Sequence, residues 1–285
     1  MVTLYQEAHA ALQESNFKPK KKLGQHFLIH RNVLETILRL VDLSRQDEVI
    51  EIGPGLGFLT RRLVEAARKV WAIEVDPSLV DWLQKSPLSS HPAFHLVPGD
   101  VLKIPLHDIL PHRKVKLVAN LPYNISTPVL FRLFELRKHF SLLVLMVQRE
   151  VAERIAGSPG SKAYGTLSIW SQIHGQILDR VQVSPEAFFP RPRVKSTVLK
   201  FGLHAEPLVS GKDLPVLRGV VRASFGQRRK TLSNALGAGL KLRRDEVETC
   251  LRQASIDPRR RGETLSVSEF IRLGRALQTV LIMDS

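Results

Sequence analysis

The feature that most constrains the fold is an alternation of short apolar runs with amphipathic segments between residues 47 and 201. The apolar runs have the length of strands, and the segments between them repeat apolar residues at helical spacing. Strands that alternate with helices form right-handed β-α-β units and a mostly parallel sheet. The sequence therefore predicts an α/β fold. Strands are expected at 47–52, 70–75, 94–97, 115–120, 141–147, 177–183 and 196–201, and helices at 31–42, 58–68, 78–85, 126–138, 148–156 and 166–175.

The pattern changes around residues 202–212, after which no further strand is predicted. Helical periodicity continues to the end of the chain, and a second, smaller, all-helical domain is expected there. Its helices are predicted at 213–225, 229–238, 243–253 and 266–279. The predicted division is a basic leader and arm at 1–22, an α/β domain at 23–205 and a helical domain at 206–285.

The charge of the chain is strongly basic and unevenly distributed. The 285 residues carry a formal net charge of +15. Residues 1–179 hold 22 Lys and Arg against 17 Asp and Glu, and residues 180–285 hold 20 against 10. The N-terminal excess lies in the acid-free stretch 18–31, so both ends are basic around a neutral middle. Such clustering indicates a polyanionic partner, most simply nucleic acid, with a merely solubilising surface as the alternative.

The cysteine content and the hydropathy pattern limit the compartment. Cys250 is the only cysteine, which excludes internal disulfides and thiolate metal clusters and fits a reducing compartment. No apolar run approaches the roughly 18 residues that a membrane span requires. The N-terminus has no apolar stretch of the kind that a secretory signal contains. We expect a cytoplasmic protein that does not bind a membrane.

A glycine-rich turn with acids at successive strand ends predicts a nucleoside-containing cofactor. Gly53, Gly55 and Gly57 follow the first strand, where glycine lets a ligand approach the backbone. Glu74 ends the second strand, where an acid can hold ribose hydroxyls, and Asp100 ends the third, where an adenine amino group would lie. A dinucleotide fingerprint would need its last glycine at position 58, which is Phe. For Glu74, an ordinary surface acid is the alternative.

The segment Asn120–Tyr123 carries the candidate chemistry. It follows a buried strand and brings together an amide side chain, an unpaired Leu121 carbonyl and an aromatic ring. Pro122 has no N–H and disfavours the α conformation at Leu121. Two oxygen acceptors beside an aromatic face suit a flat base with an exocyclic amino group. An ordinary Asn-Pro loop is the alternative.

A second aromatic residue is available to stack on the other face of such a base. Phe188 and Phe189 lie beside the rigid turn 190–192, and core packing is the alternative for each. The base would have to leave its own stack to reach the site.

These motifs resemble the ribosomal RNA adenine dimethyltransferases that act on the small subunit. The resemblance spans about residues 18–280 and rests on LGQHFL at 23–28, EIGPGLG at 51–57, IEVD at 73–76, GDVL at 99–102, NLPYNISTP at 120–128, FFPRPRVKS at 188–196, ASFGQRRKTLSNAL at 223–236 and IDPRRRGETLSVSEF at 256–270. The first six motifs are shared with the large-subunit rRNA adenine methyltransferases of antibiotic resistance. The last two are typical of the small-subunit branch.

The resemblance implies a Rossmann-like class I methyltransferase domain that uses S-adenosyl-L-methionine and no metal. It implies two methyl transfers to N6 of each of two adjacent adenosines, in a hairpin near the 3′ end of small-subunit rRNA. The partner is then a partly assembled small ribosomal subunit, and we expect the enzyme to act as a monomer. Residues 1–17 lie outside the resemblance, and no role is assigned to them.

The site residues implied by the resemblance fall into three groups. The catalytic segment is Asn120, Leu121, Pro122 and Tyr123. The cofactor contacts are His26, Leu28, Gly53, Gly55, Gly57, Glu74, Asp100, Val101 and Asn120. The substrate contacts are Tyr123, Phe188, Arg228, Arg229 and Lys230, with Arg259, Arg260 and Arg261 as further phosphate contacts. The family usually has Asn where His26 stands, and an imidazole can replace one hydrogen bond of an amide.

Three alternatives to the leading prediction remain at this point. One is a large-subunit rRNA adenine methyltransferase, and another is a DNA adenine methyltransferase, because the Asn-x-Pro-Tyr pattern is also used there. The third is an RNA-binding ribosome-assembly factor without a catalytic role. Intact Asn120, Glu74 and glycines argue against the last.

Overall fold

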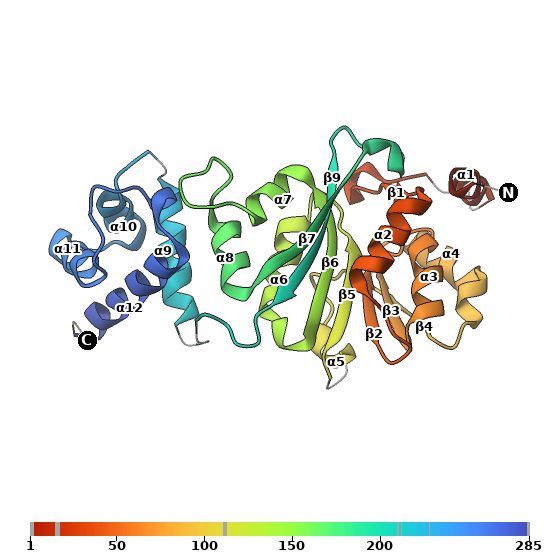
Figure 1. Ribbon diagram of the computed structural model, residues 1–285, viewed down its shortest axis with the longest axis horizontal. Helices are drawn as coiled ribbons and strands as arrows, with labels where there is room; N and C mark the ends of the chain where they lie inside the picture. The colour runs from red at the N-terminus through yellow and green to blue at the C-terminus, as the bar shows by residue number, and fades with distance from the viewer. Residues whose placement is uncertain are drawn as a thin grey trace. The chain divides into compact units, whose positions relative to one another are not determined.

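The computed structural model describes residues 3–14, 18–110, 113–209, 211, 213–227 and 229–283 (Figure 1). The chain forms two compact units. The first comprises residues 1–152 and 176–203, and the second comprises residues 153–175 and 204–285.

The first unit is built on a seven-stranded sheet with the order β4-β3-β2-β5-β6-β9-β7. β2 pairs in parallel with β3 and β5, β3 with β4, and β5 with β6, whereas β9 runs antiparallel to β6. The prediction of a mostly parallel α/β sheet is thereby confirmed. The strands are β2 (Glu48–Ile52), β3 (Lys69–Glu74), β4 (Phe94–Pro98), β5 (Val115–Asn120), β6 (Phe140–Gln148), β7 (Gly175–Val183) and β9 (Ser196–Leu203).

Helices cover both faces of this sheet. Figure 1 shows α2, α3 and α4 along one face and α6 along the other. Every residue of β2 is buried, as expected for a central strand covered on both sides. The helices are α1 (Leu4–Glu14), α2 (Arg31–Val41), α3 (Phe58–Ala66), α4 (Pro77–Lys85), α5 (Leu106–Ile109), α6 (Ser126–Glu135) and α7 (Arg149–Ile155).

The order of the strands creates a crevice beside β2. From β2 the chain proceeds to β3 and β4 on one side, and then returns to place β5 and β6 on the other. The loops that follow β2 and β5 therefore lead in opposite directions and leave a crevice at the carboxyl ends of these strands. Open α/β sheets bind their ligands in such a crevice.

The first unit has two further elements near the N-terminus. Residues 4–14 form the helix α1, whose Ala8 and Ala11 are buried in the core of the first unit. A two-residue strand, β1 (Phe27–Leu28), pairs antiparallel with β8 (Phe188–Phe189). Two-residue strands carry no periodicity, so sequence patterns cannot detect them.

The second unit consists of helices, and those predicted after residue 212 are confirmed to within a few residues. The unit contains α8 (Thr166–His174), α9 (Leu214–Gly226), α10 (Leu232–Leu240), α11 (Arg244–Gln253) and α12 (Val267–Met283). Its core holds Phe225 and Phe270, whose rings stack with centroids 5.9 Å apart.

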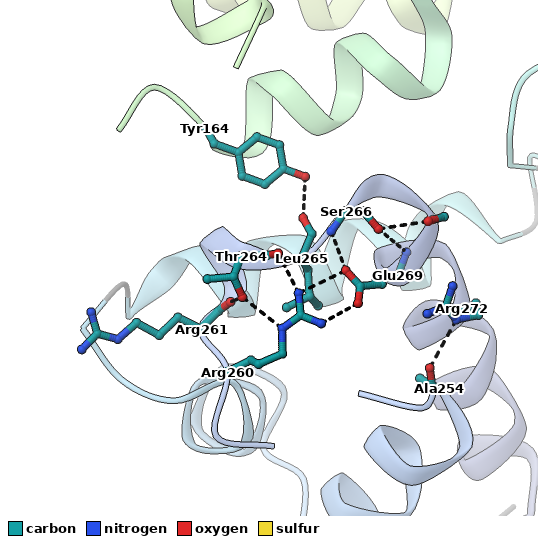
Figure 2. Close-up of polar contacts among 10 residues, drawn as sticks. Tyr164, Ala254, Arg260, Arg261, Thr264, Leu265, Ser266, Glu269 and Arg272 are labelled. Carbon is teal, nitrogen blue, oxygen red and sulfur yellow. Dashed lines mark hydrogen bonds and ion pairs between the residues drawn. The ribbon is translucent and has the colours of Figure 1, made fainter. Parts of the chain in front are cut away.

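Residues 153–175 belong to this second unit, whereas the predicted domain 23–205 includes them. The buried Tyr164 packs edge-on against Phe225, and its hydroxyl donates to the Leu265 carbonyl at 2.7 Å (Figure 2). The Arg218 guanidinium lies over the Trp170 ring at 5.8 Å. Long-range packing of this kind is not visible in local periodicity. The later crossing between the units, at 203/204, lies two residues from the predicted boundary at 205/206.

Within the described part of the chain, no helix has both the length and the apolar character that a membrane crossing would require.

Candidate active site

One pocket opens at the carboxyl ends of β2, β3 and β5. The space that it encloses, with its open mouth included, is about 1020 Å³. Its walls come from the glycine turn after β2, the ends of β3 and β4, the segment after β5 and residues 23–28. The structure thus brings the predicted cofactor and catalytic motifs together in the first unit.

The glycine turn forms the floor of this pocket. Gly53, Gly55 and Gly57 have φ angles of 70°, 58° and 83°, in the left-handed region that side chains disfavour. A Cβ atom at Gly55 would lie 3.0 Å from the ring of Phe27. Gly53 and Gly55 line the pocket, whereas Gly57 does not, and a Cβ atom at Gly57 would lie 2.8 Å from Leu88.

Glu74 lies at the end of β3 with only 4% of its surface exposed. Oε2 accepts from the Gly55 N–H at 3.2 Å, and Oε1 accepts from the N–H groups of Val75 and Asp76. Burial raises the pKa of Glu74 and the Asp76 carboxylate adds to the rise, whereas the backbone donors oppose it. Oε1 already accepts two hydrogen bonds, whereas Oε2 keeps a lone pair with which it can accept from a hydroxyl.

A second buried carboxyl, Glu51, lines the same pocket. Glu51 lies two residues before Gly53, and it was not among the predicted cofactor contacts. Its Oε2 has no hydrogen-bond partner among the described residues. Burial raises the pKa of Glu51 to about 8, the Thr60 hydroxyl opposes the rise and the nearby Glu74 adds to it. Glu51 is therefore protonated at neutral pH, which reduces the repulsion between two buried acids.

Asp100 and Val101 stand at the third strand end. Asp100 Oδ1 accepts from the Leu102 N–H at 2.9 Å, and its side chain remains 31% exposed. Val101 is buried and lines the pocket as an apolar surface. Asp100 can accept from the amino group at the edge of an adenine ring, and the apolar Val101 can pack on the face of the ring.

Asn120 is oriented by the backbone of a distant segment. Its Nδ2 donates to the His26 carbonyl at 3.0 Å, so its Oδ1 points the other way. The Leu121 N–H donates to the Met146 carbonyl at 3.0 Å. Neither Asn120 Oδ1 nor the Leu121 carbonyl accepts a hydrogen bond from the described residues. Both residues line the pocket, and their role in binding a base stays a prediction.

The Tyr123 ring is held at both its edge and its face. Its hydroxyl and the Ser196 hydroxyl are 2.6 Å apart, and burial raises its pKa. The His26 imidazole is stacked on it, with ring centroids 5.5 Å apart. The Nδ1 atom of His26 lies 2.6 Å from the Pro190 carbonyl, so that nitrogen carries the proton in this contact. Leu28 lines the pocket and is buried.

Phe188 does not line the pocket. Only 2% of it is exposed, and it belongs to the core of the first unit while it pairs with Leu28 in β1. Phe189 is half-buried and packs edge-on against Tyr5. Phe188 thus shows the core packing that stood as the alternative, whereas Phe189 is only half-buried, and the stacking role of Phe188 stays a prediction.

The predicted phosphate contacts differ in their surroundings. Arg229 and Lys230 are exposed, and Arg228 lies outside the described residues. Arg260 pairs through two nitrogens with Glu269 (Figure 2). Arg259 pairs with Asp257. Figure 2 shows Arg261 pointing away from this network. Arg260 is therefore structural, whereas an exposed Arg261 can meet an anion.

The residues of the pocket fit S-adenosyl-L-methionine. The buried Glu74 carboxyl suits ribose hydroxyls, Asp100 and Val101 suit adenine, and the open glycine turn leaves room for the amino-acid part. His26 and Leu28 close the side of the pocket that faces Asn120.

Known proteins of one family resemble this chain over nearly its full length. Residues 16–277 match the family described as "Ribosomal RNA adenine dimethylase". The chain is 46% identical to "Ribosomal RNA small subunit methyltransferase A" of Syntrophotalea carbinolica over 264 residues, which cover 92% of this chain and 98% of the relative. It is 43% identical to the protein of that name from Clostridium botulinum over 266 residues, which cover 93% and 96%.

Solved structures share the fold. A dimethyladenosine transferase from Plasmodium falciparum superposes with a TM-score of 0.75 at 24% identity, covering 90% of this chain and 98% of that one. The 23S rRNA methyltransferase ErmE gives a TM-score of 0.67 at 27% identity, covering 88% and 99%. The strand order, the pocket with its acids and glycines, and the match over 16–277 lead to one conclusion: this chain belongs to the ribosomal RNA adenine dimethylase family.

Proposed function

We propose that this protein transfers methyl groups from S-adenosyl-L-methionine to N6 of adenine in small-subunit rRNA and produces N6,N6-dimethyladenosine. The observation that carries the proposal is the orientation of Asn120. The His26 carbonyl holds its amide nitrogen, which leaves Oδ1 free to accept, and the adjacent Leu121, which also lines the pocket, has an unpaired carbonyl among the described residues. Relatives at 42–46% identity that are named small-subunit methyltransferases support this acceptor over large-subunit RNA.

Residues from three strand ends would hold the cofactor. Glu74 would accept from a ribose hydroxyl, Asp100 would accept from the adenine amino group, and Val101 would pack on the ring. The turn at 53–56 would approach the amino-acid part, with His26 and Leu28 lining the remaining side. When bound, the cofactor supplies an electrophilic methyl group.

The two acceptors act on the nucleophile. The lone pair of adenine N6 is delocalised into the ring, which makes the nitrogen flat and weakly nucleophilic. In the first transfer, Asn120 Oδ1 and the Leu121 carbonyl would accept its two hydrogens and favour a tetrahedral nitrogen with an available lone pair. The methylated nitrogen would then release one proton to water, with S-adenosylhomocysteine as the other product, and in the second transfer one hydrogen would remain for one acceptor. Tyr123 stacks on the base and restricts its position, so that positioning supplies most of the rate.

The proposed acceptor is a pair of adjacent adenosines in a hairpin near the 3′ end of the RNA. Each adenosine is methylated twice, within a partly assembled subunit. The enzyme acts as a monomer in the cytoplasm. Residues Arg228, Arg229, Lys230 and Arg261 bind RNA phosphates from the second unit, which contains the predicted RNA-binding domain 206–285.

One acceptor panel tests the proposal. The protein is incubated with labelled S-adenosyl-L-methionine and with unmodified small subunits, large-subunit RNA or duplex DNA, and the products are digested to nucleosides. We expect dimethyladenosine only from the small subunits. Preferred methylation of large-subunit RNA or DNA would overturn the proposed substrate. Binding to small subunits without methyl transfer would show an assembly factor instead.

A further inference from the structure

Asp76 is a buried carboxylate that holds the N-terminal arm, residues 18–28, against the first unit. None of its side chain is exposed. Its Oδ1 accepts from Lys20 Nζ at 2.6 Å and from the Ser78 N–H at 3.0 Å, and its Oδ2 accepts from Gln25 Nε2 at 2.7 Å. Burial alone would raise the pKa of Asp76, but the hydrogen bonds from Lys20, Gln25 and Ser78 hold it below the ordinary value. The group is therefore ionised.

Gln25 connects this carboxylate to the arm backbone. While its Nε2 donates to Asp76, its Oε1 accepts from the Lys20 N–H at 2.7 Å and closes the loop between them. The next residue is His26, whose carbonyl accepts from Asn120 Nδ2 and whose ring is stacked on Tyr123. A continuous set of contacts thus runs from the end of β3 to the end of β5.

A second tie fixes the arm close to the catalytic segment. Asn124 Nδ2 donates to the Lys22 carbonyl at 3.0 Å. Gly24 adopts a φ angle of 61°, and a Cβ atom there would lie 2.9 Å from Asn124 Oδ1. The arm is therefore tied at Lys22 and at Gln25, on both sides of Gly24, which leaves His26 little freedom to move.

We propose that Asp76 and Gln25 are positioning residues that keep the His26 carbonyl against the Asn120 amide. The consequence for methyl transfer rests on the proposed function. An Asn side chain presents an acceptor or a donor to the pocket according to which way its amide is turned. With the His26 carbonyl in place, Nδ2 is occupied and Oδ1 faces the pocket. Without it, Asn120 can turn Nδ2 toward the amino group of the base, where two donors oppose each other.

A role of Asp76 limited to capping α4 can be separated from this one. Asn caps a helix about as well as Asp. Asp76→Asn therefore preserves the bond from the Ser78 N–H, but it places an amide nitrogen against Gln25 Nε2 and removes the charge that faces Lys20. Gln25→Glu places a carboxylate against Asp76 and breaks the same contact from the other side.

The double variant Asp76→Asn with Gln25→Glu restores the contact with reversed polarity. The amide nitrogen introduced at position 76 then donates to the carboxylate introduced at position 25, which also accepts from the Lys20 N–H. Asp81→Asn is the matched control, because Asp81 is an exposed acid on the same helix, α4. Three properties are measured: kcat on small subunits, the Kd of S-adenosylhomocysteine, and amide hydrogen exchange of residues 18–28.

Each single variant is expected to lower kcat about tenfold or more, because small displacements of a positioned group have effects of this size. Exchange in the arm should become faster, and the side-chain NH₂ resonance of Asn120 should shift. The double variant should recover most of kcat, and Asp81→Asn should match the wild type. A kcat that is unchanged in the single variants, or not recovered in the double variant, overturns the proposal.

The exchange and resonance measurements need no RNA substrate. They separate failure of this inference from failure of the proposed function. If wild-type protein methylates none of the acceptors, the proposed function fails, and the contact between the arm and Asn120 is still tested. If Asp76→Asn leaves arm exchange and the Asn120 resonance unchanged, the positioning role is wrong, whatever the activity.

Discussion

The imidazole of His26 lies against the ring of Tyr123, with the two planes 28° apart and the centroids separated by 5.5 Å. His26 thereby contacts both halves of the catalytic segment, because its carbonyl also holds the Asn120 amide. One face of Tyr123 is therefore covered by the arm, and a base that stacks on that face must displace the imidazole.

Replacing His26 by Asn, the residue usual in the family, should separate the two contacts. The backbone carbonyl still holds Asn120, and the amide replaces one hydrogen bond of the imidazole. We expect the Kd of S-adenosylhomocysteine to rise by no more than about tenfold, because an aromatic pair is worth about 0.5–1.5 kcal/mol. The Tyr123 ring should flip faster in NMR spectra. Unchanged Tyr123 signals would contradict the stacking.

Asn120→Ala should abolish methyl transfer and leave RNA binding nearly intact. The change removes one of the two acceptors that make the adenine nitrogen nucleophilic, but it removes no positive charge. We expect kcat to fall by about 10²-fold or more, with RNA affinity measured by filter binding in parallel. Asn32 is exposed on α2, and Asn32→Ala is the control. Loss of RNA binding in Asn120→Ala would show a structural role instead.

Replacing Arg229 and Lys230 by Ala should weaken RNA binding at all sequences. Both side chains are exposed in the second unit. The slope of log K against log salt should become shallower by about 0.7–0.9 for each phosphate that is no longer neutralised. Arg62→Ala removes a charge from the first unit, where it pairs with Glu35, and should leave the slope unchanged. Equal effects of both replacements would contradict a specific RNA surface.

Glu51 should make the protein less stable as the pH rises. Its pKa is about 8 in the folded state against 4.5 in the unfolded chain, so the folded state binds the extra proton between these values. The free energy of unfolding should therefore fall across this window, by at most about 1.4 kcal/mol for each pH unit. Glu51→Gln keeps the size of the side chain and removes this dependence. A variant with the same pH profile as the wild type would contradict the raised pKa.

Glu269 should have the opposite effect in acid. The hydrogen bonds from Arg260 lower its pKa to about 2, so its stabilising contribution is present above the unfolded value of 4.5 and is lost as the pH falls toward 2. The protection of the α12 amides against hydrogen exchange, relative to the intrinsic rate at each pH, should fall over this range in the wild type. In Glu269→Gln the exchange should already be faster at neutral pH and should depend less on acid. Equal exchange in the two proteins at neutral pH would contradict a stabilising Arg260–Glu269 pair.

Local patterns in the chain were enough to predict the sheet, the helices and the identity of the pocket. The apolar runs at 48–52 and 115–120 are strands because a central parallel strand is buried on both faces. The glycines at 53, 55 and 57 indicated a tight turn, because glycine adopts a positive φ more easily than other residues. All three have a positive φ in the structure. Such features depend on a residue and its near neighbours, and a sequence displays them directly.

Packing between distant segments set the remaining features of the site. The Asn120 amide is oriented from 94 residues away, and Gln25 meets Asp76 across 51 residues. Phe188 packs into the core through a two-residue strand that has no periodicity, and residues 153–175 join the C-terminal helices through Tyr164. These contacts depend on the geometry of the folded backbone, which no local pattern of side chains encodes. Periodicity therefore sufficed for the framework, and the folded chain alone placed His26 between Asn120 and Tyr123.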